Sequence, residues 1–324
     1  MQNKELIDQC EQKARQWLAP AFDEATRKAV QNMLDSDNKD TLIESFYKDL
    51  EFGTGGLRGI MGAGTNRMNI YTVGMATQGF ANYLKMNFKD KEQISVVVCH
   101  DCRNNSRLFA ETVANIFSAN GIKVYLFDDL RPTPECSFAI RHFKAQGGVN
   151  ITASHNPREY NGYKAYWDDG AQVLAPHDKG IIDQVNQVKI EDVKFKGDKN
   201  LIQIIGEDVD KAYLDKVKTV CIDPEVIKRQ HDLCIVYTPL HGAGRVIIPR
   251  SLQEWGFTNV HCVKEQMVKD GNFPTVDRPN PEIAEALTLG LRDAKKLDAD
   301  ILMASDPDAD RVGMACKESN GEGL

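Results

Sequence analysis

The stretch ISVVVCHDCRNNSRLFAETVANIFSANGIKVYLF, residues 94–127, decides the fold class of this chain. It begins with a short apolar run, ISVVVC (94–99), which is typical of a buried strand. SRLFAETVANIFSANG (106–121) then repeats apolar residues at three- and four-residue spacing, which predicts a helix, and KVYLF (123–127) is again strand-like. A strand, a helix and a strand in this order indicate a βα unit of a mostly parallel sheet.

The same alternation extends in both directions along the chain. A helical pattern at 73–88 precedes the stretch, and a helix that starts at a proline follows it, before the apolar strand GGVNI (147–151). After a charged, irregular stretch at 190–200, which we expect to be an edge hairpin or loop, the alternation restarts near residues 205–211 and reaches the strand-like DILMAS (300–305). We therefore predict an α/β protein with two similar βα domains, each with a mixed, mostly parallel sheet flanked by helices. The predicted divisions are an N-terminal helical cap at 1–50, a first domain at 51–208 and a second at 209–324.

Composition restricts the classes of function. The 324 residues contain 42% hydrophobic and 27% charged residues, which is typical of a globular protein. The 47 acidic and 40 basic residues leave a formal charge of −7, which argues against a broad nucleic-acid footprint. The N-terminus lacks the apolar core of a signal peptide, and no stretch approaches the length of a membrane span. We expect neither a nucleic acid nor a membrane as a partner.

The 8 cysteines are scattered along the chain, as in proteins of a reducing compartment, so we predict a cytoplasmic location. One pair, Cys99 and Cys102, lies between a predicted strand and a predicted helix, where a thioredoxin-like redox pair would lie. This redox alternative competes with the three segments that follow.

The segment DPDADR, Asp306 to Arg311, directly follows the strand-like DILMAS. Residues two apart in an extended chain project to the same side, so Asp306, Asp308 and Asp310 can direct three carboxylates at one point. Such oxygen ligands suit Mg²⁺ or Mn²⁺. An EF-hand loop is excluded, because it needs glycine where Arg311 stands and glutamate where Lys317 stands. The remaining alternative is a solvated acidic turn.

The segment TASHNP, residues 152–157, follows the strand GGVNI. A serine at the end of a strand is well placed to act as a nucleophile or phosphate carrier, and Ser154 is the candidate. The segment is not a nucleophile elbow, which needs glycine on both sides of the serine. We do not expect His155 by itself to pair with Ser154, because neighbours in an extended chain point to opposite faces. The alternative is an Asn-Pro turn with a capping serine.

The segment FGTGGLRG, residues 52–59, combines glycines, which let a backbone approach an anion, with the planar guanidinium of Arg58. It fits neither a Walker A loop nor a dinucleotide fingerprint, because the required lysine and third glycine are absent. The alternative is a flexible loop with an incidental arginine.

Together, in this order and spacing, the three segments resemble the α-D-phosphohexomutase superfamily, which includes phosphoglucomutases and phosphomannomutases. TASHNP is similar to the phosphoserine loop, DPDADR to the metal-binding loop, and FGTGGLRG to an N-terminal arginine loop. NGYK (161–164) and TPLHGAG (238–244) add further matches. The long N-terminal cap most resembles the phosphoglucomutase branch that also contains phosphopentomutases.

The resemblance implies a phosphosugar mutase that interconverts glucose 1-phosphate and glucose 6-phosphate, or the corresponding mannose or pentose phosphates. Ser154 would carry the phosphoryl group, and one Mg²⁺ would be bound by the three aspartates and a phosphoserine oxygen. A bisphosphorylated sugar would be the intermediate, and glucose 1,6-bisphosphate the activator. Substrate phosphate would be bound by Ser154 and by basic side chains, and Lys164, in a partly neutral form, would accept the proton of the reacting hydroxyl. The basic side chains are Arg58, His155, Lys164 and Arg311.

The resemblance also implies two further domains, III and IV, which select the sugar and bind its distal phosphate, and no motif of either occurs in the 324 residues. We therefore expect a truncated form that is weak or inactive without these C-terminal domains as partners. The last residues, 313–324, are predicted to be a strand and turn. The alternative function is a non-catalytic module that binds a metal or a phosphosugar. Arg103, which could contact the serine loop, and His241 receive no role.

Overall fold

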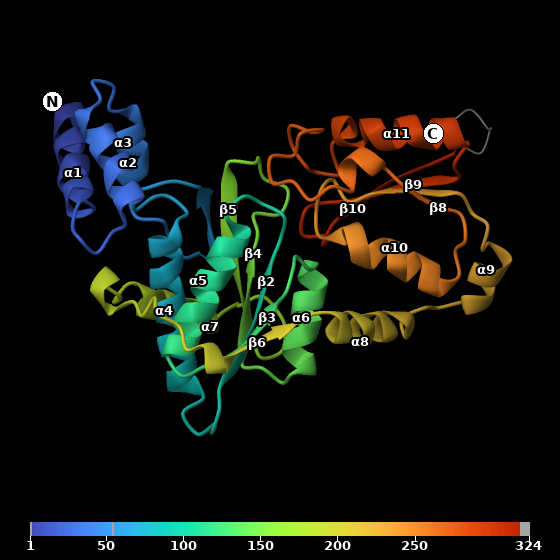
Figure 1. The fold of residues 1–324 in the computed structure, drawn as a ribbon, viewed down its shortest axis with the longest axis horizontal. Helices are drawn as coiled ribbons and strands as arrows, with labels where there is room; N and C mark the ends of the chain where they lie inside the picture. The colour runs from blue at the N-terminus through green and yellow to red at the C-terminus, as the bar shows by residue number, and fades with distance from the viewer. Residues whose placement is uncertain (1, 54, 318–324) are drawn as a thin grey trace.

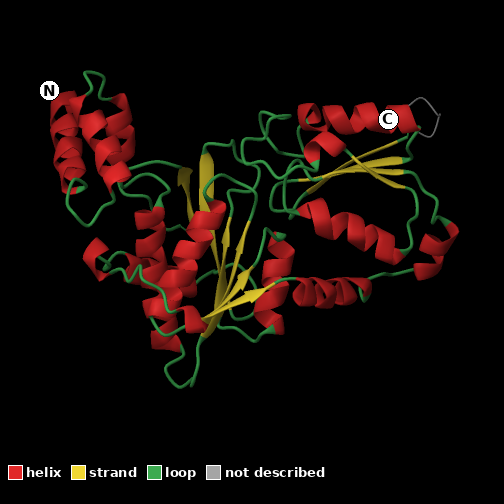
Figure 2. Cartoon of the chain, in the orientation of Figure 1, coloured by secondary structure: helices red, strands yellow, loops and turns green. Residues whose placement is uncertain are grey.

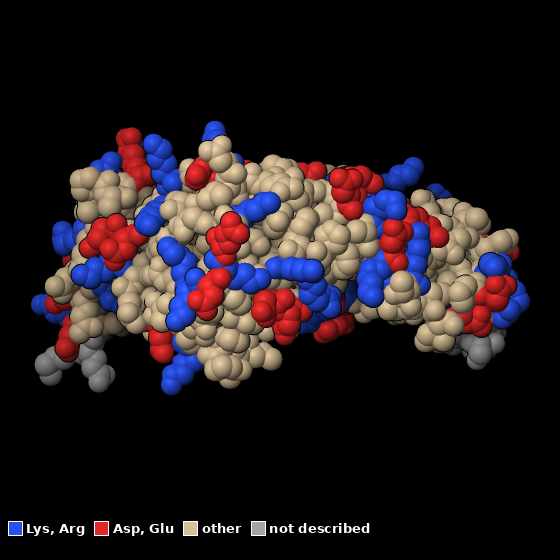
Figure 3. All heavy atoms as spheres, turned by 90° about the horizontal axis from the view of Figure 1, so that it is seen from below, with Lys and Arg blue, Asp and Glu red and all other residues tan. Residues whose placement is uncertain are grey.

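The computed structural model describes residues 2–53 and 55–317, so that Thr54 and part of the predicted C-terminal strand and turn lie outside the described residues. Three groups of elements follow one another along the molecule: N-terminal helices, a first sheet with its helices, and a second sheet with its helices (Figure 1; Figure 2). None of the described helices is long and apolar enough to span a membrane. On the face that Figure 3 shows, lysine and arginine side chains alternate with aspartate and glutamate rather than forming one basic field.

The N-terminal group consists of helices only, as the apolar spacing predicts. Its members are α1 (Gln2–Gln16), α2 (Glu24–Asp35) and α3 (Asp40–Phe46). Asp23 starts α2, because its carboxylate accepts a hydrogen bond from the backbone N–H of Thr26 at 2.9 Å. Trp17 and Phe22 stack in the small core of this group and contact Tyr71 of α4 (Ile70–Asn87), which joins the group to the first sheet.

The first sheet has the order β1-β5-β4-β2-β3-β6. The four strands β4, β2, β3 and β6 are parallel, whereas β5 pairs antiparallel with both β4 and β1. Its strands are β1 (Gly56–Ile60), β2 (Ser95–His100), β3 (Lys123–Phe127), β4 (Gly147–Ile151), β5 (Tyr160–Trp167) and β6 (Ile202–Ile205). The helices around it are α4 (Ile70–Asn87), α5 (Ser106–Ala119), α6 (Thr133–His142) and α7 (His177–Val185).

Alternate residues of β2 face opposite layers, as the pleat of a strand requires. Val96 and Val98 pack with α4 and α5, whereas Val97 and Cys99 pack with α6 on the other face (Figure 1). All four side chains are buried, which explains why this strand is a continuous apolar run in the sequence.

The second sheet has the order β10-β9-β7-β8, with β9, β7 and β8 parallel and β10 antiparallel at the edge. Its strands are β7 (Ile235–Thr238), β8 (Val260–Cys262), β9 (Ile301–Ser305) and β10 (Val312–Cys316). The helices α10 (Gly244–Trp255) and α11 (Thr288–Leu297) cover opposite faces (Figure 1). The helix α8 (Glu207–Lys218) contacts both α6 and α10 and so joins the two halves. The predicted α/β class with two mixed, mostly parallel sheets is confirmed.

The structure corrects several local expectations. Residues 56–60 of the glycine-rich segment form the edge strand β1 rather than a loop, because Gly56 to Ile60 pair with β5. In the charged stretch, η1 (Ile190–Asp192) and η2 (Lys199–Leu201) are short 3-10 helices, and the strand β6 that follows them was not predicted. The helix α9 (Pro224–Arg229) and the short helix η3 (Lys264–Gln266) were not predicted either, whereas η4 (Ala284–Leu287) lies within a stretch expected to be helical. The proposed domain limits stay a prediction.

Candidate active site

Three loops meet where the two sheets approach each other, and each loop follows the carboxyl end of a strand. The loop after β2 begins at Asp101, the loop after β4 contains Ser154, and the loop after β9 contains Asp306. Because β2 and β4 are parallel neighbours, their following loops lie at the same edge of the first sheet. The loop after β9 reaches this edge from the second sheet.

Ser154 connects the two sheets directly. Its hydroxyl donates a hydrogen bond to Oδ2 of Asp306 at 2.7 Å, and the Ser154 residue is buried. Its backbone has a φ of +53°, in the left-handed region that a serine rarely adopts. This turn overturns the expectation from extended geometry that His155 points away, because Nδ1 of His155 lies 3.2 Å from the Ser154 hydroxyl. Partial burial, with help from the charges of Arg311 and Arg58, lowers the pKa of His155 and so favours its neutral form.

Arg103, for which we expected a contact with the serine loop but no role, binds that loop through its guanidinium. Its guanidinium donates hydrogen bonds to the carbonyl oxygens of Ser154 (2.6 Å), Pro157 (2.9 Å), Tyr160 (3.0 Å) and Asn156. It also lies 3.3 Å from the carboxylate of Asp101, and both side chains are fully buried. This arginine therefore orders the backbone that carries Ser154.

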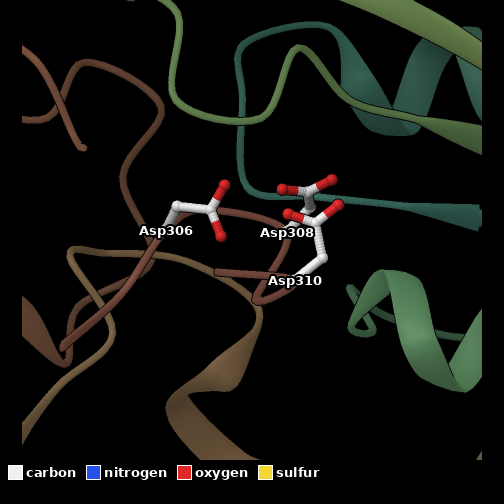
Figure 4. Close-up of side chains that lie close together, drawn as sticks. All are labelled: Asp306, Asp308 and Asp310. Carbon is white, nitrogen blue, oxygen red and sulfur yellow. The ribbon is translucent and has the colours of Figure 1, made fainter. Parts of the chain in front are cut away.

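The side chains of Asp306, Asp308 and Asp310 point toward one another (Figure 4), and one oxygen of each lies within 4.8 Å of the others. They come from a turn rather than from the expected extended chain, since residues 306–310 contain no strand and Ala309 has a φ of +53°. The predicted convergence of the carboxylates is therefore present, but its geometric reason was wrong.

The protonation of the triad reflects its crowding. Burial, together with the charge of Asp308, raises the pKa of Asp306 to about 8. Burial alone would also raise the pKa of Asp308, but the charge and hydrogen bond of Lys164 hold it below the usual value. A second cation would relieve the remaining repulsion between these carboxylates.

The oxygens of the triad fit a hard divalent cation. Oδ2 of Asp308 accepts hydrogen bonds from Nζ of Lys164 at 2.7 Å and from Oγ1 of Thr133 at 2.8 Å. Oδ1 of the same carboxylate is buried and has no hydrogen-bond partner among the described residues. A buried carboxylate oxygen without a donor is costly unless a cation or water meets it. With the other two carboxylates and the Ser154 hydroxyl, this oxygen completes a donor set that suits Mg²⁺ or Mn²⁺.

Lys164, on β5, lies between two of the aspartates. Its ammonium donates hydrogen bonds to Asp308 at 2.7 Å and to Asp310 at 3.0 Å, and its side chain is only 11% exposed. Burial opposes the charged form, but the two carboxylates outweigh burial and raise the pKa of Lys164 above its ordinary value. This direction is opposite to the partly neutral lysine that we expected.

Of the two expected arginines, Arg58 contacts the serine loop and Arg311 contacts the acidic triad. Arg58 is exposed on β1 and donates a hydrogen bond to the side chain of Asn156 at 3.2 Å. The backbone N–H of Arg311 donates to Asp306 at 3.1 Å, whereas its guanidinium pairs with Glu282 at 3.0 Å rather than with an aspartate of the triad. The structure thus brings Arg58, Ser154, His155, Lys164, Arg311 and the triad into one region.

The segment TPLHGAG supports the loop that carries the three aspartates rather than lining the site. His241 is buried, and its two ring nitrogens contact the carbonyl of Val268 and the hydroxyl of Thr275, each at 2.8 Å. The backbone of Gly242 packs so closely against Pro307 that a Cβ atom on residue 242 would lie 2.4 Å from the proline Cα. A glycine is therefore required at position 242, where the chain contacts the loop that carries the aspartates.

The redox alternative finds no support. Cys99 and Cys102 are both buried, and burial raises the pKa of each thiol well above its ordinary value. Reactive redox cysteines need the opposite, a lowered pKa and access to solvent.

Two family models match most of the chain. "Phosphoglucomutase/phosphomannomutase, alpha/beta/alpha domain I" matches residues 49–191, and the domain II model of the same family matches residues 211–321. The chain belongs to this phosphoglucomutase/phosphomannomutase family. The predicted membership of the α-D-phosphohexomutase superfamily is confirmed.

Relatives within this family have several mutase activities in their names. A human phosphopentomutase is 38% identical over 325 residues, which cover 96% of this chain and 53% of the human protein. A phosphoglucomutase of Staphylococcus haemolyticus is 38% identical over 300 residues, covering 90% of this chain and 53% of that protein. A solved structure from Thermus thermophilus, provisionally named a phosphomannomutase, is 27% identical with a TM-score of 0.70, covering 83% of this chain and 57% of that one. The chain spans about half the length of the curated relatives it matches.

Proposed function

We propose that this chain carries the phosphoryl-transfer site of a phosphosugar mutase, with Ser154 as the phosphoryl carrier. The observation that carries the proposal is the 2.7 Å hydrogen bond from Ser154 to Asp306, which joins a strand-end serine of one sheet to the acidic triad of the other. A hydroxyl beside three converging carboxylates and several basic side chains is suited to bind and transfer a phosphoryl group.

Asp306, Asp308, Asp310 and an oxygen on Ser154 would hold one Mg²⁺. When bound, this ion supplies positive charge that polarises the phosphoryl group and stabilises the charge of the transition state. The triad is suited to this role because Oδ1 of Asp308 is buried and lacks a donor within the described part of the chain.

In the transfer step, the bond between phosphorus and Oγ of Ser154 breaks as a bond forms between phosphorus and a hydroxyl oxygen of the sugar phosphate. The hydroxyl loses its proton, and Oγ of Ser154 regains one. His155 is suited to exchange that proton, because its Nδ1 lies 3.2 Å from Oγ and its lowered pKa favours the neutral ring. The return of the second phosphate to Ser154 reverses these changes and leaves the sugar phosphorylated at the other position.

The basic side chains would bind the phosphate. Arg58 is exposed beside the serine loop, and Arg311 could exchange Glu282 for a phosphate oxygen, because this ion pair is partly exposed. For Lys164, the raised pKa argues against a proton acceptor while Asp308 and Asp310 bind its ammonium group. We therefore assign Lys164 the role of neutralising these carboxylates and of donating to a substrate oxygen.

The substrate would be a hexose or pentose phosphate, with glucose 1,6-bisphosphate as activator. The names of the relatives include both phosphopentomutase and phosphoglucomutase, so they support the class of substrate and not one sugar. Turnover would also require segments of the kind that the longer relatives contain, since a sugar must be selected and its second phosphate bound. A cytoplasmic location is consistent with the 8 free thiols.

The test is incubation of the chain with glucose 1,6-bisphosphate and Mg²⁺, followed by intact-mass and peptide mass spectrometry. We expect one phosphoryl group on Ser154, none in the Ser154→Ala variant, and normal labelling in Ser36→Ala, which changes an exposed serine at the end of α2. Binding of Mn²⁺ or of the bisphosphate without any phosphoryl acceptance would instead support the non-catalytic module and overturn the proposal. Turnover of glucose 1-phosphate and ribose 1-phosphate by a chain extended to the length of the relatives would then decide between the two sugars.

A further inference from the structure

We propose that Thr133 is a positioning residue that orients the carboxylate of Asp308 for the divalent cation, and that it does so from the opposite sheet. The inference rests on the proposed function, because it takes Asp308 as a metal ligand. Thr133 is the first residue of α6 and belongs to the first half of the chain, whereas Asp308 follows β9 of the second half.

Thr133 contacts Asp308 through two hydrogen bonds. Its backbone N–H donates to the carbonyl oxygen of Asp308 at 2.8 Å, and its Oγ1 donates to Oδ2 of the carboxylate at 2.8 Å. One bond fixes the backbone of the metal-binding loop, and the other fixes the rotation of the side chain. Thr133 therefore holds both the backbone and the side-chain carboxylate of Asp308.

The direction of the hydroxyl proton is determined by Asn150 of β4. The side-chain N–H of this fully buried asparagine donates to Oγ1 of Thr133 at 2.8 Å. A threonine hydroxyl has one proton to donate, so with Asn150 as its donor, Oγ1 directs that proton to Asp308. Asn150, Thr133 and Asp308 thus form a polar chain from the first sheet to the metal-binding loop.

This arrangement selects which oxygen of Asp308 is left for the cation. Both donors, Thr133 and Lys164, bind Oδ2, whereas the buried Oδ1 has no hydrogen-bond partner within 2–53 and 55–317. Lys164 alone would fix the carboxylate poorly, because its ammonium is shared with Asp310 and can rotate. The neutral, β-branched Thr133 has few rotamers and supplies a fixed direction.

The test measures the dissociation constant for Mn²⁺ of Thr133→Val and of the wild-type chain. Electron paramagnetic resonance detects the free ion in each titration. Valine keeps the shape and the backbone N–H of Thr133 but removes the hydroxyl. We expect the dissociation constant for Mn²⁺ to rise about 10- to 100-fold, the range for loss of a group that orients a metal ligand. Thr133→Ser should bind Mn²⁺ within about 3-fold of wild type, because it keeps the same donor.

Two controls separate this role from a general loss of structure. Thr112→Val makes the same change in α5, where the hydroxyl only bonds the carbonyl of Leu108, and should bind Mn²⁺ normally. Urea unfolding of each variant shows whether the fold persists, and Thr133→Ala replaces Thr133→Val if valine prevents folding. A purely structural Thr133 would lower the stability and leave Mn²⁺ affinity unchanged among the folded molecules, which overturns the inference.

Asp308→Asn distinguishes failure of the inference from failure of the proposed function. If wild type and Asp308→Asn bind Mn²⁺ equally, Asp308 is not a ligand and the proposed metal site is wrong. If Asp308→Asn loses binding while Thr133→Val retains it, the metal site stands and the positioning role of Thr133 is wrong.

Discussion

Replacement of Arg103 by leucine should strongly destabilise the first half of the chain. The guanidinium is fully buried, lies 3.3 Å from the equally buried carboxylate of Asp101, and donates hydrogen bonds to four carbonyl oxygens of residues 154–160. Removing one partner of a buried ion pair costs about 3–5 kcal/mol, because the other charge remains without compensation. The four carbonyls can regain bonds to water only if the serine loop moves.

Asp101 moderates this loss in two ways. Its Oδ1 keeps hydrogen bonds from the backbone N–H of residue 103 at 2.9 Å and from Ser106 at 2.7 Å. Burial already raises the pKa of Asp101, so without Arg103 the carboxyl can take up a proton. We therefore expect Arg103→Leu to lower the free energy of unfolding by about 3–5 kcal/mol and not by more.

Urea unfolding at pH 7, followed by the fluorescence of Trp17 and Trp167 in a Trp255→Phe background, measures this change in the first half of the chain. The matched control is Arg158→Leu on the same loop, whose pair with Glu159 at 3.3 Å is exposed and should contribute less than about 1 kcal/mol. The double variant Asp101→Asn/Arg103→Leu should lose less than the sum of its single variants, by about 1–3 kcal/mol. If Arg103→Leu unfolds within about 1 kcal/mol of wild type, the argument that this arginine orders the serine loop is wrong.

Three further changes test other parts of the structure. Burial and the neighbouring Asp210 raise the pKa of Glu135 from 4.5 to about 9, so its protonated form stabilises the fold below pH 4.5, and this contribution is lost as the pH rises through 9. In urea unfolding, the stability of Glu135→Gln relative to wild type should therefore increase by up to about 1.4 kcal/mol per pH unit between about pH 5 and 8. A difference that stays constant with pH would contradict this. Tyr71→Phe removes two hydrogen bonds to Asp23, at 2.6 and 2.8 Å, and should lower the thermal stability of the N-terminal helices by about 1–2 kcal/mol, measured by circular dichroism. Gly242→Ala should displace Pro307 and weaken Mn²⁺ binding at least about tenfold, whereas Gly53→Ala, whose Cβ meets nothing nearer than 3.9 Å, should not.

The sheets could be predicted because their strands carry a local signal, and the exceptions lack one. ISVVVC, KVYLF and DILMAS are apolar over most of their length, since their strands are covered on both faces. Strand β1 has the sequence GLRGI, and two glycines and an arginine provide no apolar pattern. Its extended state depends on pairing with β5, a partner about a hundred residues later in the chain, so no window of the sequence around it contains the cause.

The acidic triad could be predicted for a similar reason, because its three aspartates are close in sequence and oxygen chemistry suffices to recognise them. The contact of Arg103 with the serine loop was expected, but its hydrogen bonds to four carbonyl oxygens were not. The loop of Arg103 follows β2 and the serine loop follows β4, and because the structure pairs these strands as parallel neighbours, their carboxyl ends are adjacent. An arginine in the first loop is therefore within reach of the second, which is the contact that we expected for Arg103.

Thr133 is different, because its partner lies in a turn after a strand of the second sheet, 175 residues along the chain. The same is true of the contact between Ser154 and Asp306, which are 152 residues apart and which only the family resemblance placed together. Both contacts depend on how the two sheets pack, and α8 influences that packing because it contacts helices of both halves. Thr133 donates to Asp308, and Ser154 donates to Asp306. A shift between the sheets would therefore have two effects at once: it would separate the serine from the triad and change the direction of Oδ1 of Asp308. The order of the loop that carries the three aspartates and the position of Ser154 therefore both depend on the packing between the two halves, which a pattern within either half does not contain.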